Sequence, residues 1–530
     1  MDKISRIYRQ RWYTLAVLSL SLIIVVIDNT ILNVALPTMQ QELGATGSEL
    51  QWMVDAYILV FASLLFTMGS LADKIGRANM LRAGMVIFAG GSLWAMTAGS
   101  PDIVVAARAI MGIGAACIMP ATLAVIMHVF PPDERGKAIG IWASLSGIGI
   151  ALGPIIGGLL IEYFSWSAIF FINIPIAIIA LTAGAFFLPN SKNPTPQNID
   201  YIGTILSAGA LGILVYGLIN GGERGWSDTT VIGYLVGSVG FGILFVLWER
   251  HSVNPMLEIG LFRNRRFSAG AAGIALMILT FFGIVFGLTL YMQFVQGYSA
   301  LETGIRFLPM AAGFAIGSGT SHRRVSKFGT TYVVAAGFLG IALLFAGASF
   351  WGIETPYWIL GPMLFAIAFC AGNNQATNID SVISAVPLSR AGVGSAMNSV
   401  SGQVGGAIGV AALGSVLMSE YTSSIRPALA DIQGLPAGVV TAAEGSVGEA
   451  MIIADQLPPD VGSIVTSAAS NSFIDGWQVM SLVACGVAIV ATIIAIKFMP
   501  PRPLLRSKAD ITVTCPPKMI SDIIPDQHSI

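Results

Sequence analysis

The chain has 530 residues, of which 55% are hydrophobic and 10% are charged, and its mean hydropathy is +0.77. A soluble domain typically carries roughly 25% charged residues, so this composition excludes an ordinary soluble protein and indicates a membrane protein. The net charge of −1 gives no overall attraction to nucleic acid. Its four cysteines have no metal-ligand spacing and predict neither a metal site nor a disulfide framework.

The apolar residues form fourteen runs, each close to the length of about 20 residues that crosses a bilayer. These runs are 13–36, 51–70, 81–99, 103–127, 137–161, 167–188, 201–220, 230–248, 268–294, 303–321, 331–350, 357–381, 393–418 and 477–498. The basic segment MDKISRIYRQR resembles the start of a signal peptide, but the run after it is too long and contains an aspartate. We therefore expect an all-α polytopic membrane protein with fourteen transmembrane helices.

The distribution of basic residues predicts the orientation of these runs. If the N-terminus is cytoplasmic, 23 of the 27 lysines and arginines fall in cytoplasmic segments. The positive-inside rule then places both termini in the cytoplasm. An even number of membrane crossings requires the same arrangement, which makes the two arguments consistent.

The first run contains an acid: LIIVVIDNTILNVALP (22–37) places Asp28 among aliphatic residues. Charged residues inside a membrane are costly, rare and usually functional. Counted at ~1.5 Å per residue, Asp28 lies roughly 12 Å from the outer end of its run, and Arg108 lies roughly 8 Å from the same side in run 103–127. These similar depths allow the two residues to pair.

A pair of Asp28 and Arg108 suits proton coupling. Arginine keeps its charge, whereas aspartate can take up a proton. Burial favours the neutral acid and a nearby cation favours the carboxylate. We interpret Asp28 as the proton carrier and Arg108 as the residue that tunes it, with a static buried ion pair as the alternative. Asp55, in the second run, is either a further coupling residue or a solvated residue at the outer mouth.

A charged loop, GSLADKIGR (69–77), follows the second run on the predicted cytoplasmic side. Gly69 allows close helix approach, and Gly76 permits a tight turn. Asp73 and Arg77 are four residues apart and can pair on one helix face. The alternative to a functional loop is a solvated charged turn.

The fifth run contains the glycine-rich segment GIGIALGPIIGG (147–158). Gly149, Gly153 and Gly157 recur every four residues and predict a smooth groove on one helix face. Pro154 removes a backbone donor and favours a kink, and Gly158 lies beside the groove. Simple helix packing and a sliding surface that opens and shuts a cavity are both compatible with this pattern.

An internal repeat predicts the domain organisation. RGKAIGIWASLSG (135–147) and RAGVGSAMNSVSG (390–402) match at a constant offset of 255 residues. We expect a six-helix half at 1–188, a linker with two inserted helices at 189–250, a second six-helix half at 251–500 and a cytoplasmic tail at 501–530. Two such halves typically enclose a substrate site at mid-membrane, with access that alternates by rocking.

The twelfth run ends in CAGNNQATNIDS (370–381), which puts Asn373, Asn374, Thr377 and Asp380 on one helix face. Polar faces in membranes turn toward protein or water. This face is therefore either a cavity wall or a set of hydrogen bonds to neighbouring helices, and Asp380 can also lie in the headgroup zone. The other candidate cavity residues are Asn33, Tyr57, Tyr291 and Gln293.

The predicted outer loop at 420–476 carries seven acids against one base, Arg426. This loop either folds over the mouth as a short helical hairpin or remains flexible.

These motifs resemble those of the major facilitator superfamily, and specifically its fourteen-helix drug:proton antiporters of the EmrB/QacA type. The resemblance is carried by the loop motif at 69–77, the antiporter motif at 147–158, IDNTILNVALP (27–37) and ARAIMGIGAA (107–116). QWMVDAYIL (51–59), FFINIPI (170–176) and YMQFVQGYSALETGIRFLP (291–309) extend it over nearly the whole chain except the tail. The resemblance implies a cytoplasmic gate in which Asp73 latches one state, and a hairpin in the outer loop. Ser326 replaces that acid in the second copy of the motif, which argues against a second latch.

We therefore expect a proton-coupled antiporter that exports lipophilic, cationic compounds through a bacterial inner membrane by alternating access. An exporter of an endogenous metabolite, lipid or secreted antibiotic is the first alternative, and a receptor or sensor that does not transport is the second. The runs contain no catalytic cluster and no nucleotide-binding loop, so we expect no enzyme activity, no cofactor and no nucleotide. The expected partners are a small molecule, protons and the lipid bilayer, and the protein is expected to be monomeric.

Overall fold

The computed structural model describes residues 2–191, 200–253, 255–386, 391–430, 435 and 437–499. The described residues form helices and connecting turns, without a β-strand among them. The predicted tail at 501–530, part of the linker and Arg390, the first residue of the second repeat segment, lie outside the described residues.

The helices form two groups, with a pair of inserted helices between them in the sequence. The first half contains α1 (Asp2–Leu43), α2 (Gly47–Ile75), α3 (Arg77–Met96), α4 (Pro101–Val129), α5 (Pro132–Tyr163), α6 (Ala168–Phe171) and α7 (Asn173–Phe187). The insert contains α8 (Tyr201–Arg224) and α9 (Thr229–His251), followed by the short helix η1 (Ile259–Arg263). The second half contains α10 (Arg265–Leu290), the π-helical turn η2 (Tyr291–Val295), α11 (Ala300–Arg306), α12 (Leu308–Phe328), α13 (Thr330–Ala348), α14 (Tyr357–Ser384), α15 (Ala391–Ala430), α16 (Ala437–Gly445), α17 (Val447–Ala454) and α18 (Pro459–Phe498).

Each of the fourteen predicted runs coincides with a helix or with two consecutive helices. Ten helical stretches in the described part of the chain are long and apolar enough to cross a membrane. The run 167–188 is divided into α6 and α7 because Pro175 has no N–H and clashes with the carbonyl four residues earlier. Pro309 has the same effect between α11 and α12 in run 303–321.

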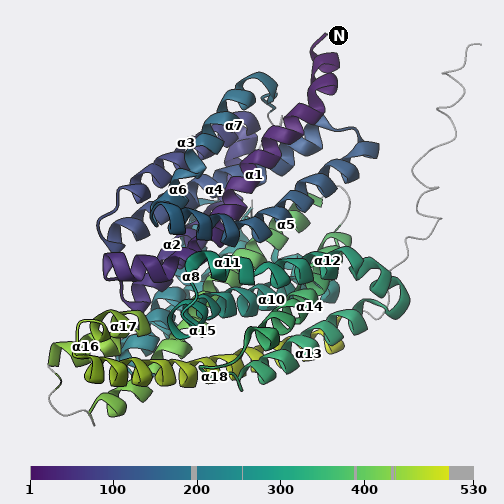
Figure 1. Cartoon of the computed structure of the whole chain (residues 1–530). Coiled ribbons are helices and arrows are strands. Elements are labelled where there is room, and N and C mark those ends of the chain that lie inside the picture. Colours follow the sequence, from purple (N-terminus) through teal and green to yellow (C-terminus); the bar gives the residue numbers. More distant parts are fainter. Residues whose placement is uncertain are drawn as a thin grey trace, which may run out of the picture.

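The two halves lie against each other, as Figure 1 shows with the purple-to-blue helices above and the green-to-yellow helices below. The inserted helix α8 packs against α2 of the first half and α15 of the second, and α9 packs against α8. Large apolar side chains of α9, such as Ile243 and Leu244, are exposed and suit contact with lipid. The insert therefore flanks the seam between the halves without replacing a helix of either.

Several contacts join the halves at one end of the bundle, which we call the hairpin end because it carries α16 and α17. Gln293 Nε2 donates to Val34 O at 2.9 Å, and Ser415 Oγ donates to Gln51 Oε1 at 3.3 Å. The opposite end carries residues 69–77 and is called the loop-motif end. The halves are thus joined where the sequence predicts the outer face.

The predicted hairpin in the outer loop is present in the structure as α16 and α17, although residues 431–434 and 436 lie outside the described residues. Tyr421 Oη donates to Ala443 O at 2.8 Å and anchors α16 on α15. Gln40 Nε2 donates to Ser446 Oγ at 2.5 Å, which ties the tip of the hairpin to α1. The hairpin therefore covers part of the seam and contacts both halves.

Candidate functional site

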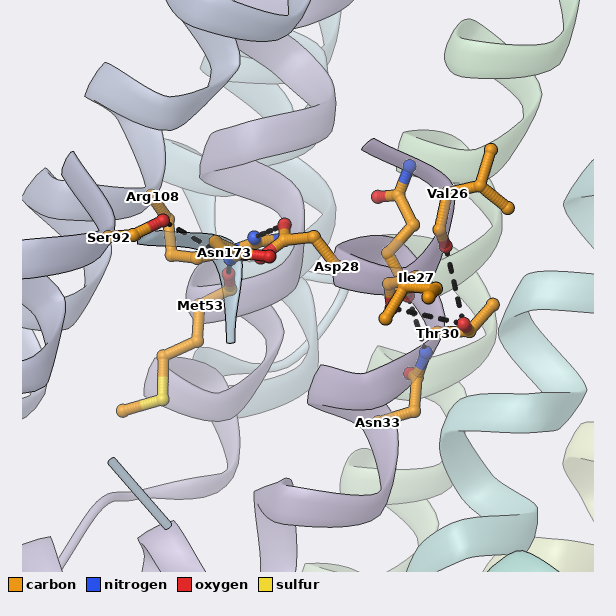
Figure 2. A network of polar contacts seen from close by, with 10 residues as sticks. Val26, Ile27, Asp28, Thr30, Asn33, Met53, Ser92, Arg108 and Asn173 are labelled. Atoms are coloured by element: carbon orange, nitrogen blue, oxygen red, sulfur yellow. Dashed lines mark hydrogen bonds and ion pairs between the residues drawn. The ribbon is translucent and has the colours of Figure 1, made fainter. Parts of the chain in front are cut away.

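Asp28 and Arg108 form a buried ion pair inside the first half. Arg108 Nη1 donates to Asp28 Oδ2, and each side chain is 1% exposed. Arg108 Nε donates to Met53 O of α2 at 3.0 Å, and the guanidinium lies 4.2 Å from the centroid of the Tyr57 ring. Figure 2 shows the pair between α1 and α4. The arginine thus has a carboxylate, a carbonyl and an aromatic face as partners, which compensates part of the cost of burying its charge.

A close approach of α4 to α2 places Arg108. A Cβ atom added to Gly112 would lie 2.6 Å from Tyr57 O, so the absence of a side chain at this position lets the two helices touch. Gly112 is one turn from Arg108 on α4, which brings the guanidinium within reach of the α2 backbone.

Asn173 of α7 and Ser92 of α3 extend the ion pair into a network across two further helices. Asn173 Nδ2, at the start of α7, donates to Asp28 Oδ1 at 3.1 Å and to Ser92 Oγ of α3 at 3.2 Å. Asn173 is 1% exposed and Ser92 is fully buried. Each carboxylate oxygen of Asp28 therefore has a hydrogen-bond donor.

The opposite face of α1 lines the seam between the halves. Figure 2 shows Thr30 and Asn33 pointing away from the Asp28 network. They line a small cavity with Pro154 of α5 and five apolar residues of the second half, namely Phe281, Phe282, Val285, Phe307 and Met310. Its volume of about 30 Å³ equals the space of about one water molecule, so a drug-sized ligand requires the halves to separate here.

The antiporter motif of α5 packs between α1 and the second half. Cβ atoms added to Gly149, Gly153 and Gly157 would meet Val26, Thr30 and Ile31 of α1 in turn. On the adjoining face, a Cβ added to Gly158 would lie 2.6 Å from Leu301 Cα of α11. The motif thus allows α5 to touch both the helix that carries Asp28 and the other half of the molecule.

The loop motif holds together the ends of α2, α3 and α4. Arg77 Nε donates to Asp73 Oδ1 at 3.0 Å, and Arg77 Nη1 donates to Ala124 O at 3.2 Å. Gly76 has φ of 115°, a backbone conformation that other residues adopt only under strain. Gly69 faces Pro120 of α4 at ordinary contact distance. The motif is therefore a packed corner with a half-exposed carboxylate at Asp73.

Asp55 is fully buried, so the alternative of a solvated mouth residue is wrong. Gln51, Asp55 and Ile58 recur at helical spacing and share a face of α2. Gln51 accepts a hydrogen bond from Ser415, and Ile58 packs beside Gly406, both on α15. Asp55 therefore lies on the face of α2 that packs against the second half, and neither carboxylate oxygen has a hydrogen-bond partner among the described residues.

The model of the family described as "Major Facilitator Superfamily" matches residues 18–410. The chain belongs to the major facilitator superfamily. It is 33% identical to the tetracenomycin C resistance and export protein of Streptomyces glaucescens, over 92% of this chain and 91% of that protein. It is 32% identical to the multidrug efflux pump LfrA of Mycolicibacterium smegmatis, over 91% of this chain and 94% of that one.

A solved structure shows the same fold at low sequence identity. It is a bacterial homologue of the human lysosomal transporter Spinster, in an inward-facing, unoccupied conformation. The TM-score is 0.62 at 16% identity, over 93% of this chain and 98% of that one. The family membership and the many apolar helices identify the protein as a multi-pass membrane transporter of the superfamily rather than an enzyme. Its relatives are named for drug resistance and export.

Two of the residues predicted to line the substrate cavity, Tyr57 and Tyr291, are buried in the core of the protein. Tyr57 is fully buried beneath Arg108 in the ion-pair network. Tyr291 is fully buried and stacks on Trp477 with ring centroids 5.4 Å apart, while its hydroxyl donates to Gly352 O at 2.8 Å. Gln293 lies at the seam, where it bonds to Val34 and lines a cavity of about 410 Å³ at the hairpin end.

The buried part of the polar face of α14, with Asn373, Asn374 and Thr377, packs against neighbouring helices. Asn373 Nδ2 donates to Val333 O of α13 at 3.3 Å, and Arg324 Nε of α12 donates to Asn373 Oδ1 at 2.8 Å. Asn374 fills the notch left by Gly337, and Thr377 is buried and bonds within its own helix. Asp380 is exposed at the loop-motif end, 3.7 Å from Arg266.

The sequence interpretation missed Asn173 and the aromatic wall of the seam cavity. Asn173 lies in FFINIPI, a segment that supports the family resemblance without indicating a role for its asparagine. An amide inside an apolar run is itself a signal, because polar groups in membranes need partners. The phenylalanines of α10 carried no comparable signal, since Phe281 and Phe282 resemble any apolar residues of a membrane helix.

Proposed function

We propose that the protein exports lipophilic, cationic compounds across the cytoplasmic membrane in exchange for protons. The observation that carries this proposal is the pair of Asp28 and Arg108 on one face of α1, with Thr30 and Asn33 lining the seam cavity on the other. A single helix thus connects a titratable site to the place where the halves meet.

The proposed topology has fourteen crossings, with both termini in the cytoplasm and the hairpin end outside. It is supported by the coincidence of each predicted run with a helix and by the lysine and arginine distribution. In this topology the 410 Å³ cavity between the halves opens to the outside. It contains one carboxylate, Glu162, and the aromatic residues Phe294 and Tyr298.

Exchange follows from the fact that Asp28 binds Arg108 most strongly as a carboxylate. Protonation removes the charge of Asp28 and weakens the hold of α4 on α1. Because Gly153 packs on Thr30 and Gly158 packs on α11, a displacement of α1 is passed through α5 to the second half. Arg108 keeps its other contacts to Met53 O and to the Tyr57 ring while the acid is neutral.

Asp55 is proposed as a second proton-coupling residue. Its oxygens are buried on the α2 face toward α15 and have no hydrogen-bond partner among the described residues. An isolated carboxylate in such a place is costly, so proton uptake and release here follow the separation of the halves. Asp73 is proposed as the acid of a cytoplasmic gate, released from Arg77 in the alternate state.

The seam cavity is proposed as part of the substrate site. Its wall of Phe281, Phe282 and Phe307 suits flat aromatic compounds, and aromatic faces attract organic cations. The name of the tetracenomycin C export protein favours a second candidate, the export of an antibiotic or another metabolite that the cell itself makes.

The experiment uses the purified full chain in liposomes with a pH gradient and ethidium as the probe. The proposal expects ethidium to move against its gradient while protons move the opposite way, and expects a protonophore, which collapses the pH gradient, to abolish the accumulation of ethidium. Proton-independent ethidium movement contradicts the coupling. If neither ethidium nor a panel of other organic cations moves, the drug-export proposal yields to export of an endogenous compound.

A further inference from the structure

The amide of Asn173 holds the oxygen of Asp28 that Arg108 does not contact. Arg108 donates to Oδ2, and Asn173 Nδ2 donates to Oδ1 at 3.1 Å. Figure 2 shows the three side chains meeting at one point. We infer that Asn173 is the positioning residue of the proton site, which serves Asp28 in both of its protonation states. This inference rests on the proposed exchange of substrate for protons.

The position of this amide is set by two other helices. Asn173 is the first residue of α7, directly after the break that Pro175 imposes on the helix. Its Nδ2 also donates to Ser92 Oγ of α3 at 3.2 Å. Both side chains are at least 99% buried. The side chain of Asn173 is therefore positioned beside Asp28 independently of α1 and of Arg108.

The amide also offers a group that the carboxylate form of Asp28 does not use. Asn173 Oδ1 is buried and has no hydrogen-bond partner among the described residues. An amide carries both donors and an acceptor, and the terminal torsion of asparagine is soft. The buried acceptor thus has no function in the network as it stands, but it has one when Asp28 is protonated.

The proton transfer balances in the following way. A proton from water binds Asp28 Oδ1 and forms an O–H group, while Arg108 keeps its charge. The Asn173 amide turns over: its Nδ2 releases Asp28 Oδ1 and Ser92 Oγ, and its Oδ1 accepts hydrogen bonds from the new O–H and from the hydroxyl of Ser92. On release, the proton returns to water and Nδ2 again donates to the carboxylate. Asn173 keeps a hydrogen bond to Asp28 in each protonation state and so keeps the side chain of the acid in the same position.

A purely structural asparagine would make a different prediction. Asn173 joins α1, α3 and α7, so its loss lowers stability in either case. A structural role leaves the titration of Asp28 unchanged once the protein is folded. A positioning role changes it, because the amide stabilises the charged acid more than Leu can.

The test is an infrared titration of the protonated carboxyl band in the full-length protein, with Asp28→Asn identifying the band that belongs to Asp28. In Asn173→Leu, which keeps the size of the side chain, we expect the titration midpoint to rise by about one pH unit, as for one lost hydrogen bond to a charged group. The matched control is Asn220→Leu, whose amide donates to Tyr216 O within α8 at 2.9 Å. This control should leave the midpoint unchanged.

An unchanged midpoint in folded Asn173→Leu overturns the inference. If this variant does not fold, Ser92→Ala decides, because it frees the amide from its other partner. A smaller rise of the midpoint supports the inference, and an unchanged one overturns it. The titration needs no substrate, so a shifted midpoint in a protein that moves no cation refutes the proposed function and leaves the contact between Asn173 and Asp28 supported.

Discussion

The side chains of Asp28 and Asn33 project from opposite sides of α1, although the two positions are only five residues apart. Their directions differ by about 140° at 3.6 residues per turn. Asp28 is paired with Arg108 inside the first half, whereas Asn33 lines the cavity at the seam. In the proposed exchange, proton and substrate therefore occupy separate places, and a movement of α1 connects them. A substrate that displaced the proton by direct competition would need Asp28 to face the cavity.

The close contact of α5 with α11 predicts that added bulk at this place prevents the two halves from closing at the seam. Gly158→Ala would place a methyl group against backbone atoms of Ala300 and Leu301, and such overpacking costs about 1–3 kcal/mol. We expect a loss of transport with retained folding, because the halves can no longer close at the hairpin end. Gly304→Ala should act likewise, since its Cβ would meet Pro154 O.

The measurement is the rate of ethidium transport in liposomes, normalised to folded protein. Gly233→Ala of α9 is the matched control, because an added Cβ there meets nothing within 4 Å. Equal transport by Gly158→Ala and Gly233→Ala would show that this contact does not take part in closure.

The loop motif predicts that a substitution of Asp73 lowers the transport rate and leaves the stability of the fold nearly unchanged. The pair of Asp73 and Arg77 is partly exposed, with side chains 32% and 20% accessible, so Asp73→Asn should cost only about 0–1 kcal/mol of folding free energy. If Asp73 latches a gate, the transport rate falls roughly tenfold at an unchanged melting temperature. Thermal melting and liposome transport of the same preparation test this, and a normal rate would refute the gate.

The aromatic wall of the seam cavity predicts an effect on substrate choice. Phe282→Ala removes an apolar, cation-attracting surface from the cavity, so we expect the apparent affinity for ethidium to weaken by about 1–2 kcal/mol. Phe186→Ala is the control, since Phe186 of α7 is 74% exposed on the outside of the bundle. Equal affinities of the two variants in a binding titration would place the substrate elsewhere.

The hairpin predicts a dependence on outer pH. Burial, and secondarily the nearby Glu49 carboxylate, raises the pKa of Glu449 from its usual 4.5 to about 7, although a hydrogen bond from Ser446 opposes the shift. The seated hairpin thus binds a proton more tightly than an unseated one, and its docking weakens as pH rises from 4.5 through about 7. Tyr421 of α15 also interacts electrostatically with Glu449, and Glu444 of α16 is paired with Arg426.

Hydrogen exchange of residues 437–454 across this pH range measures the docking. We expect protection to fall with rising pH in the wild type and to stay constant in Glu449→Gln. Asp460→Asn, which changes an exposed acid in the first turn of α18, should behave as the wild type does. The same slope in Glu449→Gln would assign the dependence to another group.

Depth counting along apolar runs predicted that Asp28 and Arg108 could meet, because a membrane fixes the height of each residue on its helix. Periodicity also showed which residues of α14 share a face. It did not show which neighbour that face meets, and Asn373 and Asn374 proved to contact α13 and α12. The same limit hid Asn173, whose partner lies 145 residues away on α1. Single-chain patterns define faces, whereas tertiary packing decides where each face is directed.

The separation of the proton site from the cavity is tested most directly with Asp28→Asn in liposomes. The amide can still accept a hydrogen bond from Arg108, and melting and ethidium binding confirm folding. We expect this variant to bind ethidium as the wild type does and to fail to accumulate it under a pH gradient. Gradient-driven accumulation equal to that of the wild type would contradict the role of Asp28 as the proton carrier and would leave Asp55 as the next acid to test.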